Sequence, residues 1–373
     1  MKIDYIHFYV EDAKASRDWF VNHMGFQSLA SGTNRHTLTT AVKSGAVKIV
    51  LSSPLTSTSP VAKFLSLHPP GVADIAFVVS DLEGVIERAI TSGVKVLQPV
   101  QQQSPGRGGG KWAKIGAWGS LTHTLRENCL NDSSSCNTHL LPIFAEEITE
   151  ESLIPLESFK GSSTNVELFT DIDHVVLNVA AGDMELALSW YENVLGFQRQ
   201  QRFTIQTDNS GLRSQVLVHP SSTVQFPINE PTSANSQVQE FLDVNRGAGI
   251  QHIALQTTGI VKAIAQLRHL GLSFLPIPST YYTPLRMNHP EFPLSSAELE
   301  EIAAQEILVD WQDKSTRALL LQTFTQPIFK EPTFFFELIE RRQEAQGFGE
   351  GNFRALFEAI EREQQKRGSL RIK

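Results

Sequence analysis

The chain has 373 residues and a formal net charge of -8, and it contains no cluster of Lys and Arg, so we expect no nucleic-acid or anionic-membrane partner. Its length exceeds one usual hydrophobic core and its composition is that of an ordinary globular protein, so two domains are expected. Two cysteines, Cys129 and Cys136, are too few for a secreted disulfide scaffold, and no apolar run reaches the roughly eighteen residues of a spanning helix, which predicts a cytoplasmic location.

The first half of the chain contains two units that each start with a strand and a helix. Residues 3–10 read as a strand, and residues 13–24 as an amphipathic helix with Trp19 and Phe20 on its apolar face and Gly25 at its end. Residues 71–78 predict a second strand, and residues 82–92 a second helix. Further short strands follow each helix.

The second half repeats this arrangement. Residues 172–179 and 184–195 match the first strand and helix, and Gly196-Phe197-Gln198 matches Gly25-Phe26-Gln27. Residues 249–255 and 260–270 match the second pair. Self-similarity over such a long period is a strong fold signal. It predicts an α+β fold of four βαβββ modules, paired into two open-barrel domains.

The domain boundaries follow from the same repeat. We expect an N-terminal module pair at residues 1–150, a linker at 151–170 and a C-terminal module pair at 171–373. The first pair is expected to serve structure and assembly. At the C-terminal end, Gly347, Gly349 and Gly351 are interpreted as a hinge before a lid helix at about 350–367, whose apolar positions include Leu356, Phe357 and Ile360.

Three side chains in the second half form a candidate metal site. His174 stands where the first half has Tyr5, and His252 stands where it has Asp74. Glu337 lies in the apolar run PTFFFELIERR, where a carboxylate should be buried and therefore needs a proton, a cation or a metal. Two imidazoles and one carboxylate on rigid strands are typical of the facial triad of non-haem Fe(II), although catalytic zinc also uses three ligands and an open position.

An ordinary ion pair is the alternative for Glu337. Its partner would be Arg341 or Arg342, but both follow near the end of the strand, where we expect them in solvent. Strand alternation also divides the neighbouring phenylalanines, with Phe335 on the same face as Glu337 and Phe334 and Phe336 on the other, in the core.

The chain from about residue 171 to 368 resembles the 4-hydroxyphenylpyruvate dioxygenases, a family of the vicinal oxygen chelate superfamily. The resemblance is carried by ordered motifs, namely IDHVVLNV, WYENVLGF, PINEP, GAGIQHIAL, PSTYY, ILVDW, LLLQTFTQPIF, PTFFFELIERR and GFGEGNF. It implies one Fe(II) per chain held by His174, His252 and Glu337. It also implies 4-hydroxyphenylpyruvate and O2 as substrates, homogentisate and CO2 as products, and a homo-oligomer.

The resemblance further implies a substrate pocket with aromatic walls and a few fixed amides or hydroxyls. The residues carried over are Ser214, Pro227, Asn229, Gln237, Gln251, Gln322, Phe324, Phe335, Phe348, Asn352 and Phe353. We assign Ser214, Asn229 and Gln237 to a polar network near the substrate. Gln251 has a second interpretation, as a partner of a neighbouring strand.

Three rival functions are open at this point. A 4-hydroxymandelate synthase would use the same ligands and substrate, but Asn229 and Phe335 favour ring hydroxylation. An extradiol catechol dioxygenase would share the ligands, but the pocket motifs argue against it. A protein of the same superfamily that binds a small molecule without turnover is the alternative from another class.

Overall fold

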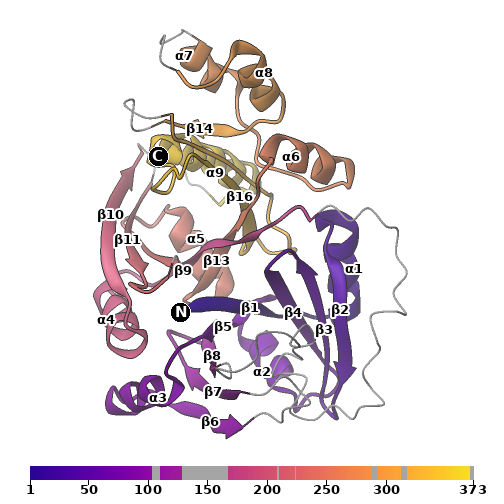
Figure 1. The fold of residues 1–373 in the computed structure, drawn as a ribbon, viewed down its shortest axis with the longest axis vertical. Helices are drawn as coiled ribbons and strands as arrows, with labels where there is room; N and C mark the ends of the chain where they lie inside the picture. The colour runs from indigo at the N-terminus through magenta and orange to yellow at the C-terminus, as the bar shows by residue number, and fades with distance from the viewer. Residues whose placement is uncertain are drawn as a thin grey trace.

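The computed structural model describes residues 1–102, 110–127, 167–207, 210–222, 224–286, 292–311 and 317–369. The expected linker at 151–170 lies outside these ranges up to residue 166, as do both cysteines. Figure 1 shows two stacked halves, the N-terminal one in indigo and purple and the C-terminal one in pink to yellow. Among the described helices, none is both long and apolar enough to cross a membrane.

The N-terminal half contains the first two modules. The first module consists of β1 (Lys2–Tyr9), α1 (Ala13–Met24), β2 (Gln27–Thr33), β3 (Thr37–Ser44) and β4 (Val47–Pro54). Helix α2 (Pro60–Leu67) connects it to the second module, which consists of β5 (Gly71–Val78), α3 (Leu82–Thr91), β6 (Val96–Gln102), β7 (Lys111–Gly116) and β8 (Thr122–Glu127).

The C-terminal half contains the other two modules. The third module consists of β9 (Asp171–Asn178), α4 (Met184–Leu195), β10 (Gln198–Gln206), β11 (Gly211–Val218) and β12 (Gln225–Pro231), and α5 (Gln237–Asn245) follows it. The fourth consists of β13 (Gly249–Gln256), α6 (Ile260–His269), η5 (Ser279–Tyr282), α7 (Thr283–Arg286), α8 (Ser296–Ala304), β14 (Leu308–Asp310), β15 (Leu319–Phe324) and β16 (Phe335–Arg342). The chain then continues into η6 (Glu350–Asn352) and α9 (Phe353–Arg367).

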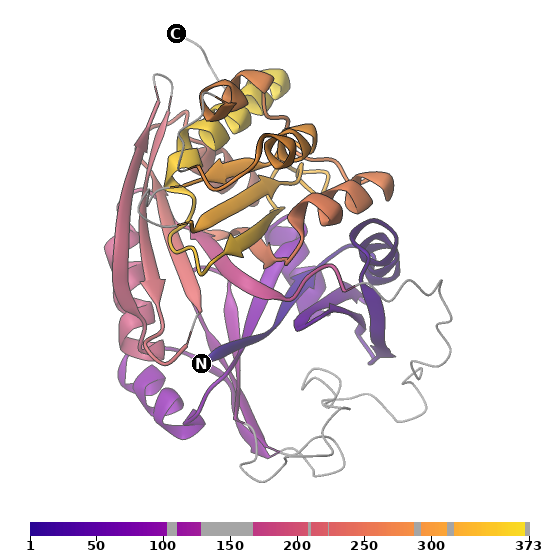
Figure 2. The same ribbon diagram turned by 45° about the horizontal axis from the view of Figure 1, so that its top comes forward.

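Each half builds one eight-stranded sheet, and the two sheets have the same topology. Their strand orders are β2-β3-β4-β1-β5-β8-β7-β6 and β10-β11-β12-β9-β13-β16-β15-β14, so every strand of the second sheet occupies the place of its counterpart in the first. The central pair is antiparallel in both sheets. The predicted α+β fold of paired βαβββ modules is confirmed. In Figure 2 the yellow helix α9 lies at the top of the C-terminal half, beside the long pink strands.

The ends of the first helix in each half show how the sequence produces the repeat. Asp12 accepts hydrogen bonds from the amides of Lys14 and Ala15 and so caps the start of α1. Gly25 ends α1 with φ 70°, and Gly196 ends α4 with φ 76°, left-handed values that suit glycine. Both glycines were predicted as helix ends.

One face of β16 joins the two halves. The ring of Phe334, just before the strand, meets that of Phe8 with centroids 4.9 Å apart, and Phe336 meets Phe20 at 6.0 Å. Both N-terminal partners belong to the same buried core as Phe334 and Phe336. Phe335 and Glu337 point to the opposite face, as the strand alternation predicts, and line a cavity there.

Replacing Phe336 by Ala should lower the free energy of unfolding by about 3–5 kcal/mol, because a fully buried ring between the halves is lost. Phe335→Ala changes the preceding residue of the same strand, which is half-buried and faces the cavity, and should cost much less. Urea unfolding of both variants measures the difference. Equal losses would show that the alternation does not separate core from cavity.

Candidate metal centre and adjoining cavity

Three central strands of the second sheet bring His174, His252 and Glu337 together. On β13, Ala254 is the register partner of His174 on β9 and of Glu337 on β16, so these three residues lie abreast. The small Ala254 side chain leaves space between its two neighbours. His252 lies two residues earlier on β13 and faces the same side, so three strands position the three functional groups.

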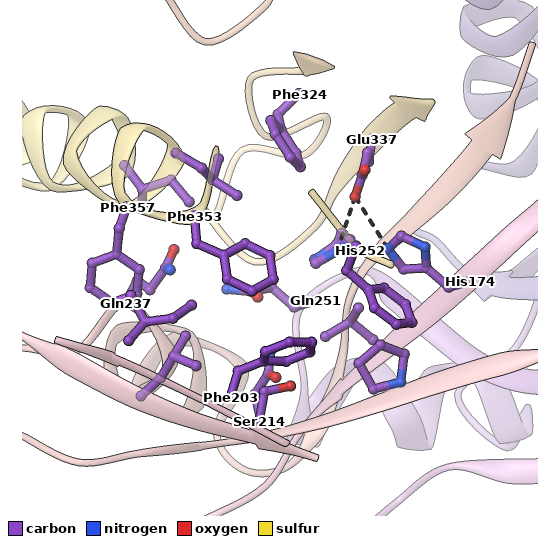
Figure 3. A pocket seen from close by; sticks show the side chains of 18 of the residues that line it. His174, Phe203, Ser214, Gln237, Gln251, His252, Phe324, Glu337, Phe353 and Phe357 are labelled. Carbon is purple, nitrogen blue, oxygen red and sulfur yellow. Dashed lines mark ion pairs between the residues drawn. The ribbon is translucent and has the colours of Figure 1, made fainter. Parts of the chain in front are cut away.

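The ligand atoms of this triad lie within 4.8 Å of one another. Glu337 Oε2 is 3.2 Å from His174 Nε2 and 3.7 Å from His252 Nε2, and Figure 3 shows the carboxylate facing both imidazoles. Glu337 is 2% exposed, and its Oε1 atom has no hydrogen-bond partner among the described residues. A buried carboxylate with a free oxygen beside two imidazole nitrogens fits a divalent transition metal.

Burial and charge give the two histidines opposite protonation behaviour. Burial by itself lowers the pKa of His174, but the Glu337 carboxylate and the hydrogen bond with Asp173 outweigh it and raise the pKa to about 9. For His252, burial and the nearby positive His174 both lower the pKa well below its usual value. In the metal-free chain a proton on His174 therefore balances the charge of Glu337.

The same positions in the N-terminal half carry a different set of side chains. Register places Ala76 abreast of Tyr5 and Thr124, as Ala254 is abreast of His174 and Glu337, and Asp74 corresponds to His252. Tyr5 is buried there against aliphatic side chains, and Asp74 lies 3.5 Å from the ammonium of Lys114. This half therefore keeps the fold and replaces the metal-binding chemistry with packing and an ion pair.

The arginines after Glu337 do not pair with it. Arg341 binds Asp173 through two hydrogen bonds of 2.7 and 2.8 Å, and Arg342 binds Glu298 and Glu340. The expectation that both would lie in solvent is wrong for Arg341, whose side chain is 13% exposed, because Asp173 and the following turn enclose it. Burial opposes ionisation of Asp173, but the Arg341 and His174 hydrogen bonds keep its pKa below the usual range.

A cavity that is partly open to solvent adjoins the triad, and the empty space in it, including some open solvent, is about 670 Å³. Of the residues expected in the substrate pocket, all but Asn352 line this cavity. They are Ser214, Pro227, Asn229, Gln237, Gln251, Gln322, Phe324, Phe335, Phe348 and Phe353. Asn352 lies behind the lining, where it accepts a hydrogen bond from Tyr281 and donates to Gln322. Gln251 is 8% exposed and contributes to the cavity wall.

Other lining residues were not predicted as site residues. They are Val176, Phe203, Ile205, Leu212, Val216, Leu356, Phe357 and Ile360. Phe203 is the register partner of Ser214, which in turn pairs with Asn229, so the three form one row across β10, β11 and β12. The alternation of Phe203 and Ile205 with the exposed residues Arg202, Thr204 and Gln206 was the available signal. Figure 3 shows Phe203 and Phe353 converging from strand and helix.

The fold and the triad define a class of protein that the comparisons identify. Two family models, both described as the Glyoxalase/Bleomycin resistance protein/Dioxygenase superfamily, match residues 171–292 and 4–112. They cover parts of both halves, in agreement with the repeated modules. The chain is therefore a member of this superfamily.

Relatives along the whole chain identify the family within it. The 4-hydroxyphenylpyruvate dioxygenase of Dictyostelium discoideum is 37% identical over 98% of this chain and 99% of its own, and that of Danio rerio is 34% identical over 100% and 93%. The chain belongs to the 4-hydroxyphenylpyruvate dioxygenase family. A solved structure, a mutant of 4-hydroxymandelate synthase from Streptomyces coelicolor, has a TM-score of 0.79 and 25% identity, covering 97% of this chain and 98% of its own.

Metal binding should release about one proton, because His174 must lose its proton to become a ligand, whereas His252 is already neutral. Raising the pH removes the competing proton, so metal affinity should rise with pH and level off above the pKa of about 9. Calorimetric Fe(II) titration without oxygen, in buffers of different ionisation enthalpy, measures both quantities. A pH-independent affinity would contradict the protonated state of His174.

Glu337→Ala should abolish Fe(II) binding and leave the fold intact.

Proposed function

We propose that this protein is a non-haem Fe(II) dioxygenase that converts 4-hydroxyphenylpyruvate and O2 to homogentisate and CO2. The observation that carries the proposal is the position of the triad at one end of a cavity with aromatic walls and a few inward amides. The membership in the 4-hydroxyphenylpyruvate dioxygenase family supports the choice of substrate. The protein is expected to act as a homo-oligomer in the cytoplasm, with one Fe(II) per chain.

Iron is the proposed metal, with His174, His252 and Glu337 as its ligands. Two imidazoles and a carboxylate leave open coordination positions, which dioxygen chemistry requires. When bound, Fe(II) supplies the redox chemistry that activates O2 and a site for the 2-oxo acid of the substrate. Zinc would fit the donor set but could not supply that redox chemistry.

The aromatic walls orient the substrate ring and keep water from the metal. Phe335 stacks on the ring of His252, with centroids 4.8 Å apart and an angle of 17° between the ring planes. It therefore supports a proposed ligand and also faces the cavity. Phe348 lies against His174 at 5.3 Å, and Phe203 lies at 5.1 Å from Phe353. A flat phenol can lie against such rings, and their apolar surfaces exclude water from the reacting atoms.

The amide and hydroxyl groups that line the cavity are few, and one of them, on Gln237, has an oxygen without a hydrogen-bond partner among the described residues. Gln237 is the first residue of α5, is 8% exposed, and its carbonyl oxygen has no hydrogen-bond partner among the described residues. A buried acceptor in this state is available to a substrate hydroxyl. Ser214 and Asn229 lie side by side on β11 and β12 and add donors and acceptors near it.

Helix α9 has the role of a lid. Its apolar residues Phe353, Leu356, Phe357 and Ile360 form one wall of the cavity. Outside that wall, Ala359 is buried in the main core, Glu361 accepts hydrogen bonds from Thr207 and Ser210, and Arg367 pairs with Glu240 on α5. An apolar face over the cavity with polar contacts towards the end of the helix suits closure over a substrate.

A 4-hydroxymandelate synthase is the second candidate, and the similarity to the solved structure of that name favours it. It would oxidise the same substrate at the benzylic carbon, so the orientation of the ring relative to the metal decides between the two products. The family membership and the retained Asn229 and Phe335 favour ring hydroxylation.

The Fe(II)-loaded enzyme should consume O2 in the presence of 4-hydroxyphenylpyruvate and release homogentisate. An oxygen electrode combined with chromatography of the products measures both. Formation of 4-hydroxymandelate instead would select the second candidate. No oxygen uptake with iron shown to be bound would refute both enzymatic functions and favour a binding protein.

Gln237→Ala should reduce kcat/KM by about 10- to 100-fold, the effect of one buried hydrogen bond lost to the substrate. Fe(II) affinity should change little, because Gln237 is not among the triad residues. Gln239→Ala is the matched control on the same helix, where the side chain is half-buried, does not line the cavity and donates a hydrogen bond to Asp243. If Gln237→Ala kept normal turnover, its place in the substrate network would be wrong.

A further inference from the structure

Arg341 connects two parts of the molecule that the proposed function uses separately. Its Nε and one terminal nitrogen donate to the two carboxylate oxygens of Asp173, at 2.7 and 2.8 Å. Its other terminal nitrogen donates to the carbonyl oxygens of Ala345 and Gly347, at 3.0 and 2.9 Å. One planar guanidinium therefore holds a strand residue and a turn at the same time.

The Asp173 side of this contact leads to the metal site. Asp173 Oδ1 lies 2.9 Å from Nδ1 of His174, the nitrogen opposite the one that faces Glu337. A carboxylate in this position fixes the orientation and the tautomer of a metal-binding imidazole. Arg341 in turn fixes the carboxylate, since it occupies both of its oxygens.

The other side leads to the turn before the lid helix. Within residues 343–349, Gln343, Glu344, Gly347 and Gly349 have positive φ angles of 49°, 58°, 82° and 75°. Two of these residues are not glycine, so this backbone is strained and depends on contacts from outside for its conformation. The Arg341 hydrogen bonds supply such contacts at two carbonyls.

The turn then returns to the metal site through Phe348. Its ring lies 5.3 Å from that of His174, and its side chain is buried and lines the cavity. The contacts thus form a closed circuit from Arg341 through Asp173, His174 and Phe348 to the turn and back. A displacement of either the imidazole or the turn disturbs the other.

The N-terminal half offers an internal comparison. Asp4 corresponds to Asp173 in the repeat, and it also pairs with an arginine of the last strand of its half, Arg126, as well as with Lys48. The residue after Asp4 is Tyr5 and not a histidine. Both halves therefore contain an acid–arginine pair, although Arg126 stands at the register position of Ile339 and not of Arg341. Among the described residues, the link from the pair to a metal-site imidazole is found in the C-terminal half.

We propose that Arg341 is a positioning residue that couples metal binding at His174 to the order of the turn at residues 343–349. Metal binding fixes the His174 ring. Through Asp173 and Arg341, the fixed ring stabilises the turn that precedes the lid helix. By reciprocity, an ordered turn strengthens metal binding. The inference rests on the metal site of the proposed function, but not on the reaction that follows.

Hydrogen–deuterium exchange of residues 345–352, measured with and without Fe(II) in the absence of oxygen, tests the coupling. In the unaltered chain, metal should slow exchange in this segment. In Arg341→Gln the metal-dependent slowing should be lost, and Fe(II) affinity should fall by about 10- to 100-fold, the usual effect of losing an outer contact to a ligand. Slowing that persists in Arg341→Gln would overturn the proposal.

Two control variants separate coupling from general destabilisation. Arg342→Gln removes the next arginine of β16, whose partners Glu298 and Glu340 do not touch His174, and Arg126→Gln removes the equivalent pair of the other half. Both should keep the metal-dependent slowing. Its loss in either control would mean that any broken ion pair has this effect, and would also refute the specific role of Arg341.

Arg341→Lys keeps a cation beside Asp173 but lacks the guanidinium group that also reaches the turn. This variant replaces Arg341→Gln in the test if Arg341→Gln does not fold. We expect a smaller loss of Fe(II) affinity than in Arg341→Gln together with reduced metal-dependent slowing, and slowing of full size would overturn the proposal. A chain that binds no Fe(II) at all would refute the metal site itself. Metal binding without any effect on residues 345–352 would refute the coupling alone.

Discussion

The charge of Glu337 is the constraint on which the C-terminal half depends. A carboxylate with 2% exposure cannot remain ionised without a compensating positive charge nearby. The arginines that follow it are engaged elsewhere, and in the metal-free chain the protonated ring of His174 provides the compensation. A divalent cation can replace that proton and also use Oε1, which has no partner among the described residues. A metal at this site therefore competes with the proton on His174.

The repeated fold shows that this constraint was placed on a scaffold that does not require it. In the N-terminal half the same strands carry Tyr5, Asp74 and Thr124, and the acid is compensated by Lys114. Burial there lowers the pKa of His123 to about 4, so that a histidine serves as a neutral core residue. Fold and chemistry are thus separable, and the N-terminal half contributes the aromatic side chains that pack behind β16.

A residue of the site could be predicted when its role is set by its neighbours in the sequence or by the repeat, and not when it is set by distant partners. The triad was accessible because the repeat exposed His174 and His252 as one-sided differences, and strand alternation assigned Phe335 correctly from its immediate neighbours. The environment of Arg341 was not accessible. Its partner Asp173 is 168 residues away, and its position depends on how β16 and β9 flank β13 and on a turn with positive φ angles. Phe203 was missed for a similar reason, since its role follows from pairing with β11.

These contacts divide the site into two parts that pack differently. The strands carrying the triad are buried in a core shared by both halves, so their positions are set by folding. Helix α9 and its preceding turn follow these strands in the sequence. They line the cavity with Phe348 and Phe353 and make a few polar contacts at their edges. The strands therefore carry the charged groups, whose mutual distances must be accurate, and the helix and turn carry apolar surface that excludes water from the cavity. The imidazole of His174 contacts both the triad and the turn, so a change at the metal site reaches the turn through this side chain.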